Sequence, residues 1–503
     1  MAQHAVRNAD ELRQACVAAR EGDEILVGSG RYDRQALLRS KRRIVIRAAD
    51  PSADAWISGG QTPNPFWGGG TPATDSPAKP DIADFAFLVI DHCEEITIEG
   101  LNIRDCWPTV ISVKDTRFLT IRGCRLRHAT YAVFAKGQTT SHLLLEDNEW
   151  QQDDSESHGL WSTIDWRESH GGEGSTGLFR YYNGGFLSAK RIAGNVVVRH
   201  NRIMDAYNGI RMKAELSDPP SINANVHIFD NDFIRIRDNP VEPEVVAHNW
   251  HVRHNRLLDC HAWFSFDGVT GGFWYFYGNT GTFESRQGLE NTFGHTMGRV
   301  LKLSYQKDPP TEDTSRVPVH PWYVFNNSWR LRCPVVGGSN PAVPPGGEGP
   351  DFTARLSFLN NAFVWCDPAR YGPWVCEWIK LLNNFDLARC VDTRFDYSIS
   401  DRWDFLDFLR KAGHEAHGIV AGRPIFADAP GGDFTLASDS EARRSGVVET
   451  FAMVDGDTDS PRLHGDRTLN RGARQDYGLT EMPKLEAQAT SFLDEIKRRS
   501  VNV

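Results

Sequence analysis

The sequence predicts an all-β fold, a single-stranded right-handed parallel β-helix with three short strands per coil and about 10–13 coils. Two observations carry this prediction. A strand–turn–strand pattern recurs roughly every 24 residues. An amphipathic segment precedes its first copy and is typical of the helix that caps an open solenoid end.

The repeat consists of a short alternating strand, a turn with Asn or Gly, and a second strand, as in EITIEGLNIRD (95–105) and WHVRHNRLLDC (250–260). Its turn residues have spacings of 23, 25, 53, 30, 24 and 24 residues and are Gly100, Gly123, Asn148, Asn201, Asn231, Asn255 and Asn279. The longest interval indicates one coil plus an insertion. Because Asn tolerates a left-handed backbone and can form a side-chain ladder on stacked coils, we expect these residues at one corner of each coil.

The β-helix domain is expected over residues 1–482, with a capping helix at about 8–20. A helical pattern at 401–413 is expected to pack against the solenoid, and residues 483–503 are expected to form a C-terminal helical tail. Segments that interrupt the repeat predict long loop insertions at about 60–82, 151–190, 305–318 and 338–351.

Composition excludes several classes of protein. A net charge of −10 and a pI near 5.9 argue against a nucleic-acid partner, and no run of 18 apolar residues predicts a membrane span. Nine scattered cysteines without a CxxC pair predict buried thiols rather than a zinc site. The N-terminus lacks the apolar region of a signal peptide, so the sequence leaves open a cytoplasmic location or a removed leader. The oligomeric state is not predicted.

Both ends of the chain resemble a known group. ELRQACVAAREGDEILVGSGRYD (11–33) is similar to the opening of pectate-lyase-like β-helix enzymes, and residues 413–446 resemble their closing segment. The stretch DNPVEPEVVAHNWHVRHNRLLDC (238–260) is similar to an uncharacterised β-helix group with a DDGIExE-like motif. The resemblance implies a carbohydrate-active enzyme with a polysaccharide or oligosaccharide substrate and a secreted or periplasmic location.

A more distant resemblance is to chondroitinase B and related alginate lyases. Their E-x-E motif matches Glu242 and Glu244, which implies that these two residues would bind Ca²⁺ if the protein is a lyase. The lysine and arginine of that family would fall near Asn249 and at Phe266, so this chain departs from the pattern at both positions.

The candidate site follows from strand periodicity, because alternate residues of a strand share a face. Aligning the strands after the Asn turns directs Ile210, Val241 and Phe264 inward. The same alignment predicts two outward columns, one with Phe134, Arg211, Glu242 and Ser265 and the other with Lys136, Lys213, Glu244 and Asp267. We expect Trp161, Trp263 and Trp274 to flank these columns as sugar-stacking platforms.

Three functions fit these residues. A glycoside hydrolase, the favoured interpretation, needs no cofactor and pairs Glu242 with Asp267 at about 5 Å or with Glu244 at about 7 Å, leaving retention or inversion open. Asp238 is a candidate third acid, and like-charge crowding is expected to raise one pKa. A polysaccharide lyase or C5-epimerase would use Lys302, Lys213 or Arg211 as base or charge clamp. A non-catalytic glycan-binding β-helix would need only the aromatic residues.

Overall fold

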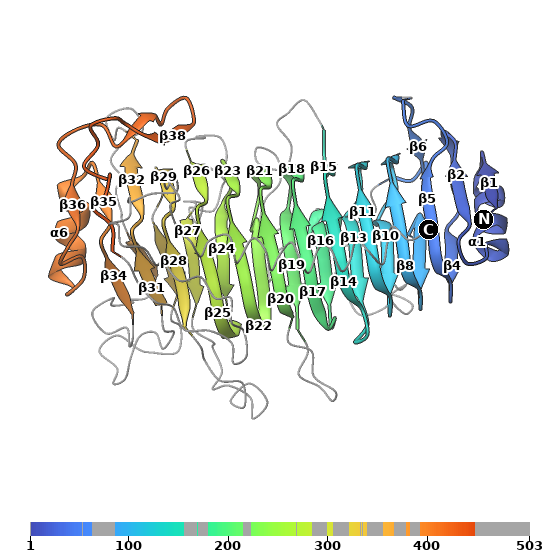
Figure 1. Cartoon of the computed structure of the whole chain (residues 1–503), viewed down its shortest axis with the longest axis horizontal. Coiled ribbons are helices and arrows are strands. Elements are labelled where there is room, and N and C mark those ends of the chain that lie inside the picture. The colour runs from blue at the N-terminus through green and yellow to red at the C-terminus, as the bar shows by residue number, and fades with distance from the viewer. Residues whose placement is uncertain are drawn as a thin grey trace.

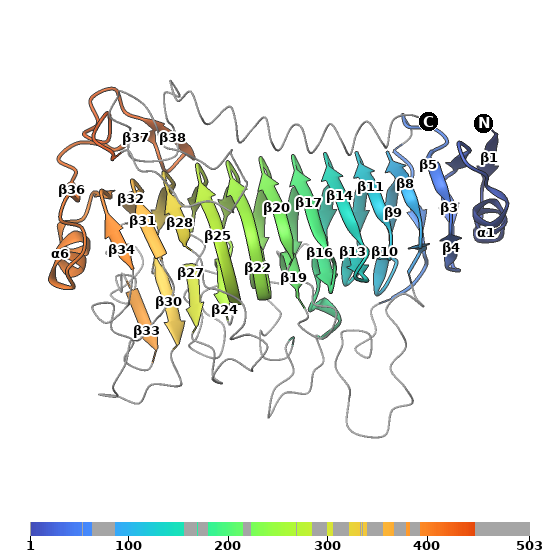
Figure 2. The ribbon, with the colours of Figure 1, turned by 60° about the horizontal axis from the view of Figure 1, so that its bottom comes forward.

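The predicted parallel β-helix is confirmed by the computed structural model (Figure 1). The structure describes residues 2–52, 54–62, 86–154, 169, 180–214, 223–267, 269–283, 299–304, 321–331, 333, 335–339, 356–366, 379–382 and 393–447. Over these residues the strands stack in parallel, coil upon coil, along one long axis (Figures 1 and 2).

Each coil contributes one strand to each of three parallel sheets. Sheet A contains β1 (Gln3–Val6), β2 (Glu24–Val27), β5 (Arg42–Ala48), β8 (Glu94–Glu99), β11 (Arg117–Arg122), β14 (Ser141–Glu146), β17 (Gly194–Arg199), β20 (Ala224–Phe229), β22 (Val241–Arg253), β25 (Val269–Tyr277), β28 (Trp322–Phe325), β31 (Leu356–Leu359) and β34 (Arg394–Asp396). Sheet B contains β3 (Gly30–Arg31), β6 (Ile57–Ser58), β9 (Asn102–Arg104), β12 (Arg125–Arg127), β15 (Glu149–Gln151), β18 (Arg202–Ala206), β21 (Asp232–Ile236), β23 (Arg256–Leu258), β26 (Thr280–Thr282), β29 (Ser328–Leu331), β32 (Ala362–Trp365), β35 (Ile399–Ser400) and β36 (Ile419–Val420).

Sheet C contains β4 (Ala36–Arg39), β7 (Leu88–Asp91), β10 (Thr109–Lys114), β13 (Tyr131–Lys136), β16 (Gly185–Lys190), β19 (Asn208–Lys213), the first residues of β22, β24 (Ala262–Asp267), β27 (Arg299–Ser304), β30 (Val336–Ser339) and β33 (Ile379–Leu382). Strand β22 bends from sheet C into sheet A. A separate antiparallel hairpin, β37 (Phe426–Asp428) and β38 (Asp433–Leu436), follows the coils.

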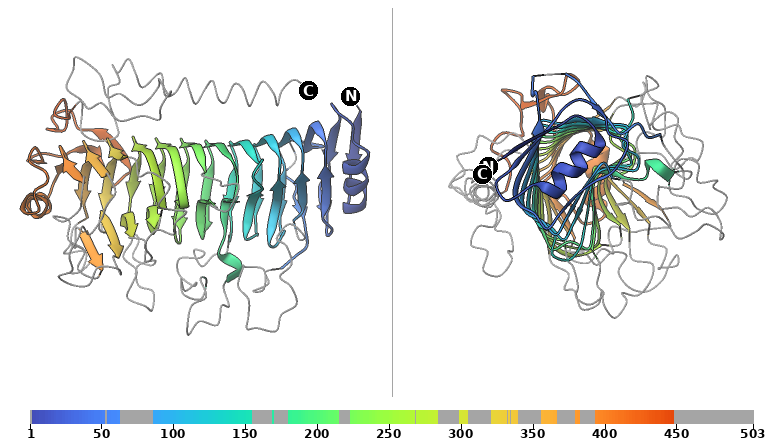
Figure 3. Two further views of the ribbon diagram at one scale, coloured as in Figure 1. Left: turned by 90° about the horizontal axis from the view of Figure 1, so that it is seen from below. Right: turned by 90° about the vertical axis from the view of Figure 1, so that its right-hand side faces the viewer.

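Helices cover both ends of the solenoid. The predicted cap is α1 (Ala9–Ala18), which lies across the coils in the end view of Figure 3. The side chain of Asn8 accepts a hydrogen bond from the Glu11 amide, and the Glu11 side chain accepts one from the Arg7 amide, so two backbone amides at the start of the helix are satisfied. At the other end, α6 (Trp403–Lys411) confirms the helix expected at 401–413. No helix in the described ranges is long and apolar enough to cross a membrane.

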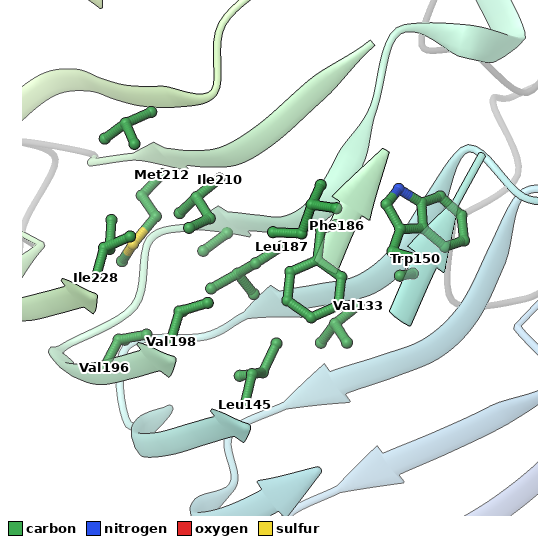
Figure 4. Packing of buried hydrophobic residues seen from close by; sticks show 14 of the residues in the cluster. Val133, Leu145, Trp150, Phe186, Leu187, Val196, Val198, Ile210, Met212 and Ile228 are labelled. Atoms are coloured by element: carbon green, nitrogen blue, oxygen red, sulfur yellow. The ribbon is translucent and has the colours of Figure 1, made fainter. Parts of the chain in front are cut away.

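The interior of the coils is an apolar core built by strand alternation. Leu145 and Val196 of sheet A point toward Phe186 and Ile210 of sheet C, and all four are fully buried (Figure 4). All seven described cysteines are buried and unbridged, as predicted; Cys376 and Cys390 lie outside the described residues.

An asparagine ladder runs along the corner between sheets A and B, as predicted. Asn231 donates a side-chain hydrogen bond to Asn255 Oδ1 at 3.0 Å and accepts one from Asn201 at 3.0 Å. We expected the asparagine itself to adopt the left-handed backbone conformation, and this is wrong. The left-handed residue is the one before it, Asp230, whose φ is 55°. The glycines of the first copies occupy this preceding position, so Gly123 corresponds to Asp147 and Cys124 donates its amide to Asn148.

The long connections all adjoin sheet C. Residues 63–85, 155–168, 170–179, 284–298 and 367–378 lie between strands of sheets B and C, and residues 215–222, 305–320, 340–355 and 383–392 lie between sheets C and A. Two predicted insertions overlap strands of the coils. Residues 185–190 of the insertion at 151–190 form β16, and residues 338–339 of the insertion at 338–351 belong to β30. The insertion at 305–318 and the tail at 483–503 lie outside the described residues.

Candidate functional site

The outer face of sheet C carries the predicted charged columns. The strand register pairs Arg211 with Glu242 and Lys213 with Glu244, whereas Ile210 and Val241 are fully buried in the core. Phe264 lies opposite Val241 and is 1% exposed, which confirms the predicted inward column and places Ser265 after Glu242.

Strand β27 extends the first column. Ser265 is paired with Lys302 in the register of β24 and β27, so Lys302 follows Ser265 along the same face as Glu242. The sequence analysis named Lys302 as a candidate base but did not place it in this column. A lysine therefore approaches the carboxylates from the C-terminal side of the stack.

A guanidinium group links the two glutamates. Arg211 Nε lies 2.5 Å from Glu244 Oε1 and 3.4 Å from Glu242 Oε2, and Lys213 Nζ lies 3.6 Å from Glu244 Oε2. Because one nitrogen reaches both carboxyl groups, their facing oxygens are separated by no more than about 6 Å, near the spacing of retaining glycosidases. Arg211 Nη1 also donates to Asn183 Oδ1 at 3.0 Å, which fixes the orientation of the guanidinium.

Glu242 is a buried carboxyl group with a raised pKa. Its side chain is 10% exposed, and Oε1 accepts a hydrogen bond from Asn239 at 2.9 Å. Burial raises the pKa of Glu242 from 4.5 to about 7; Arg211 opposes the rise and Asp238 adds to it. The predicted rise is confirmed in direction, but desolvation rather than like-charge crowding is its main cause.

Buried polar residues lie beneath this carboxyl group. Asp238 is 3% exposed and sits just before β22, as expected for a candidate third acid or orienting group. Burial lowers the pKa of His261 well below 6.5, so this imidazole is neutral at physiological pH. Burial raises the pKa of Tyr207 well above 10, with Asp238 as the next cause, so its hydroxyl keeps its proton.

A lysine ladder occupies the second column. Lys136 is paired with Lys114 on one side and with Lys190 on the other, and Lys190 is paired with Lys213. Coils stack at roughly 4.8 Å, so four ammonium groups follow one another toward Glu244. Sequence reasoning found only two of them, because β16 was assigned to the insertion at 151–190 and the strand of Lys114 was not aligned.

The predicted tryptophan platforms are wrong for two of three residues. Trp263 and Trp274 have no exposed surface. The Trp263 indole donates to the Cys260 carbonyl at 2.7 Å, and the Trp274 ring packs against both Phe266 and Trp322 inside the coils. Neither ring can therefore contact a substrate.

Two further predicted residues lie wholly or partly outside the described residues. Trp161 lies outside the described residues. The backbone of Asp267 ends β24, where it is paired with Ser304, but its side chain is also outside them.

Other aromatic residues lie beside the charged columns. Tyr131 and Phe134 are partly exposed on β13, with ring centroids 5.1 Å apart, and the Tyr131 hydroxyl donates to the Asn183 carbonyl at 3.3 Å. Tyr181 and Tyr182, in the 3-10 turn Arg180–Tyr182, have ring centroids 4.4 Å apart, with the rings tilted by 41°, and are also partly exposed. The alternation of residues in the strand YAVFAK predicts that Phe134 points outward, but no sequence pattern indicated that Tyr181 and Tyr182 lie here.

No family model and no curated protein matches the chain. Similar solved structures include the PL6 family alginate lyase AlyGC, at 13% identity over 79% of this chain and 51% of that one, with a TM-score of 0.43. This chain thus spans about half the length of AlyGC. A mannuronic acid specific polysaccharide family 6 lyase from human gut microbiota has 12% identity over 83% and 91% of the two chains, with a TM-score of 0.43. An endo-xylogalacturonan hydrolase from Aspergillus tubingensis has 8% identity over 78% and 91%, with a TM-score of 0.34. We transfer no residue role from these enzymes.

Proposed function

We propose that this protein is an enzyme that cleaves an anionic polysaccharide or oligosaccharide on the outer face of sheet C, by glycoside hydrolysis. The observation that carries the proposal is a buried carboxyl group, Glu242, whose pKa lies near 7, within about 6 Å of the ion-paired carboxylate Glu244. A protonated and an ionised carboxyl group at this spacing are what glycosidic bond hydrolysis requires.

Each glutamate takes one role in this reaction. Glu242 donates its proton to the glycosidic oxygen as the bond to the anomeric carbon breaks. Glu244 stabilises the positive charge that develops on the sugar or attacks the anomeric carbon, after Arg211 and Lys213 turn toward the substrate. Water then adds to the anomeric carbon and returns a proton to Glu242. Asp238 and Asp267 are the alternative acids, to be tested as Asp238→Asn and Asp267→Asn.

Elimination is the second candidate, and the position of Lys302 favours it. A lyase needs a base to remove the proton next to a uronate carboxylate and cations to neutralise that carboxylate. Lys302 stands in the Glu242 column, and Arg211 and Lys213 supply cations on the other side. An epimerase would use the same groups.

Calcium does not fit the two glutamates as they are arranged here. The Arg211 guanidinium lies 2.5 Å and 3.4 Å from the oxygens that would bind the ion. We therefore propose that Arg211 supplies the positive charge and that the enzyme works without a metal. Activity is expected to be unchanged after EDTA treatment; activity that is lost with EDTA and restored by Ca²⁺ would contradict this.

The nature of the products separates hydrolysis from elimination. A panel of uronic-acid and neutral polysaccharides is to be followed both by reducing ends and by the ultraviolet absorbance of unsaturated sugars. Hydrolysis predicts new reducing ends without absorbance, and elimination predicts both together. A panel that yields neither product would contradict the proposed cleavage and leave a C5-epimerase or a glycan-binding β-helix.

The lysine ladder predicts that binding depends on charge. Lys190→Gln is expected to raise KM for an anionic glycan by up to about fivefold at low salt, because a surface charge pair contributes up to about 1 kcal/mol. Salt should reduce the difference, and kcat should change little. Lys411→Gln, which replaces another exposed lysine, on α6 and outside the ladder, is the control and should leave KM unchanged. Equal effects of the two variants would show that the ladder does not bind substrate.

A further inference from the structure

The outer face of sheet A is buried although it faces away from the core. Leu144 and Val197 have no exposed surface, yet each lies between two residues that point into the coils. Leu143, Leu145, Val196 and Val198 belong to the core cluster, whereas Leu144 and Val197 do not. Alternation therefore directs Leu144 and Val197 outward, and something on that face must cover them.

The covered stripe has limits. In the register of sheet A, the Leu144 and Val197 column continues with buried residues as far as β28: His227, His251, Tyr275 and Tyr323, none more than 8% exposed. Beyond β28 the column opens, since Ser357 is only partly buried and Arg394 is exposed. Toward the N-terminus the same column stays buried at Thr120 and Thr97, which are 2% and 4% exposed. The covered stripe therefore runs from β8 to β28, seven coil steps or about 34 Å in all.

The chain itself supplies an occupant that starts at the right place. The described helices lie at the solenoid ends, α1 against β1, β2 and β4, and α6 against β35 and β36. Val447 exchanges two hydrogen bonds of 2.8 Å with the Asn360 side chain, directly after β31, at the edge of sheet A and one coil beyond Tyr323. Residues 448–503 follow from this point.

The last part of residues 448–503 has the pattern of an amphipathic helix. Its apolar residues stand at helical spacing, one stripe formed by Leu485, Ala489, Phe492, Leu493 and Ile496. A helix over 484–499 at 1.5 Å per residue is about 24 Å long, so it can cover about five of the seven coil steps of this stripe. We propose that the C-terminal segment docks on the outer face of sheet A, within the stripe from β8 to β28, through these residues.

The test is hydrogen exchange of the full-length protein, read on peptides from 484–499. A helix of this length is marginal in water by itself, so docking should slow its exchange by about a hundredfold or more. Phe492→Asp with Ile496→Asp should abolish the protection and increase binding of a hydrophobic dye. Ser491→Asp, on the polar side of the same helix, is the matched control and should retain it.

Two results would overturn the proposal. One is exchange at 484–499 as fast as that of an unstructured peptide. The other is protection that appears only as protein concentration rises, together with a dimer in light scattering, which would assign the face to a second copy. Turnover should be unaffected by the double variant, since sheet C is a different face, so failure here is distinct from failure of the proposed function.

Discussion

Replacing Glu242 with Gln is expected to lower kcat by about 10²–10⁴-fold, the usual contribution of a general acid. Gln keeps the shape of the protonated side chain and can keep the contact with Asn239, but it has no proton to transfer. In the wild type, kcat/KM should fall as pH rises through about 7, where Glu242 loses its proton. That limb of the profile should be absent from the residual activity of Glu242→Gln.

The same substitution should stabilise the fold at neutral and higher pH. Glu242 has a folded-state pKa raised above 4.5, so the folded protein holds a proton that the unfolded chain releases, and stability decreases as pH rises from about 4.5 to 7. The full cost above pH 7 is on the order of 3 kcal/mol for a shift of this size. Denaturation of the variant and wild type at pH 4 and pH 8 checks this: their stabilities should be equal at the lower pH and differ at the higher one.

Glu149→Gln is the matched control for both effects. Glu149 is 27% exposed on sheet B and pairs with Arg127 at 3.2 Å, away from the site. It should leave turnover unchanged and change the free energy of unfolding by less than about 1 kcal/mol, as is usual for a surface ion pair. Full turnover by Glu242→Gln with increased stability would show that the carboxyl group is buried and protonated as described but is not the acid.

The fold could be predicted from the sequence because successive coils repeat the same strand and corner pattern. Asn201, Asn231 and Asn255 occur at near-constant spacing since each must satisfy the corner of the coil before it. The charged columns were accessible for a similar reason: once Val241 is assigned inward, Glu242 and Glu244 point outward by alternation.

The errors arose where alternation ends. Trp263 lies within β24, between the paired residues Ala262 and Phe264, and it breaks the alternation because its ring is buried like that of Phe264. The ring packs against Gly281, at which an added Cβ would lie 2.4 Å from it. Trp274 lies in the aromatic run FWYFY of β25, in which the residues on both faces of the strand are buried. Because all five are aromatic, the residue types do not indicate which side chains point into the core. The burial that raises the pKa of Glu242 also depends on tertiary packing that no local pattern encodes.

Replacing Asn231 with Leu is expected to cost about 3–5 kcal/mol of unfolding free energy. The Asn231 side chain donates to the Val198 and Phe229 carbonyls and to Asn255, each at 3.0 Å, and accepts from the backbone and side chain of Asn201. Leu has nearly the same volume but no polar atoms, so these partners remain buried without hydrogen bonds, at about 1 kcal/mol or more each. Denaturant or thermal unfolding measures the loss.

Asn225→Gly is the control from the same coil. Asn225 belongs to a second amide ladder on the outer face, donating to Asn195 and accepting from Asn249 at 2.9 Å. Its φ of 56° suits Gly, and the Asn195 bond is exposed to solvent, so water replaces it and the loss should stay below about 1 kcal/mol. Equal destabilisation by both variants would mean that the buried ladder has no special role. A much larger loss for Asn231→Leu would show that the asparagine whose spacing predicted the fold also stabilises the stacking of the coils. The reason is that no water reaches the inner corner to replace its hydrogen bonds.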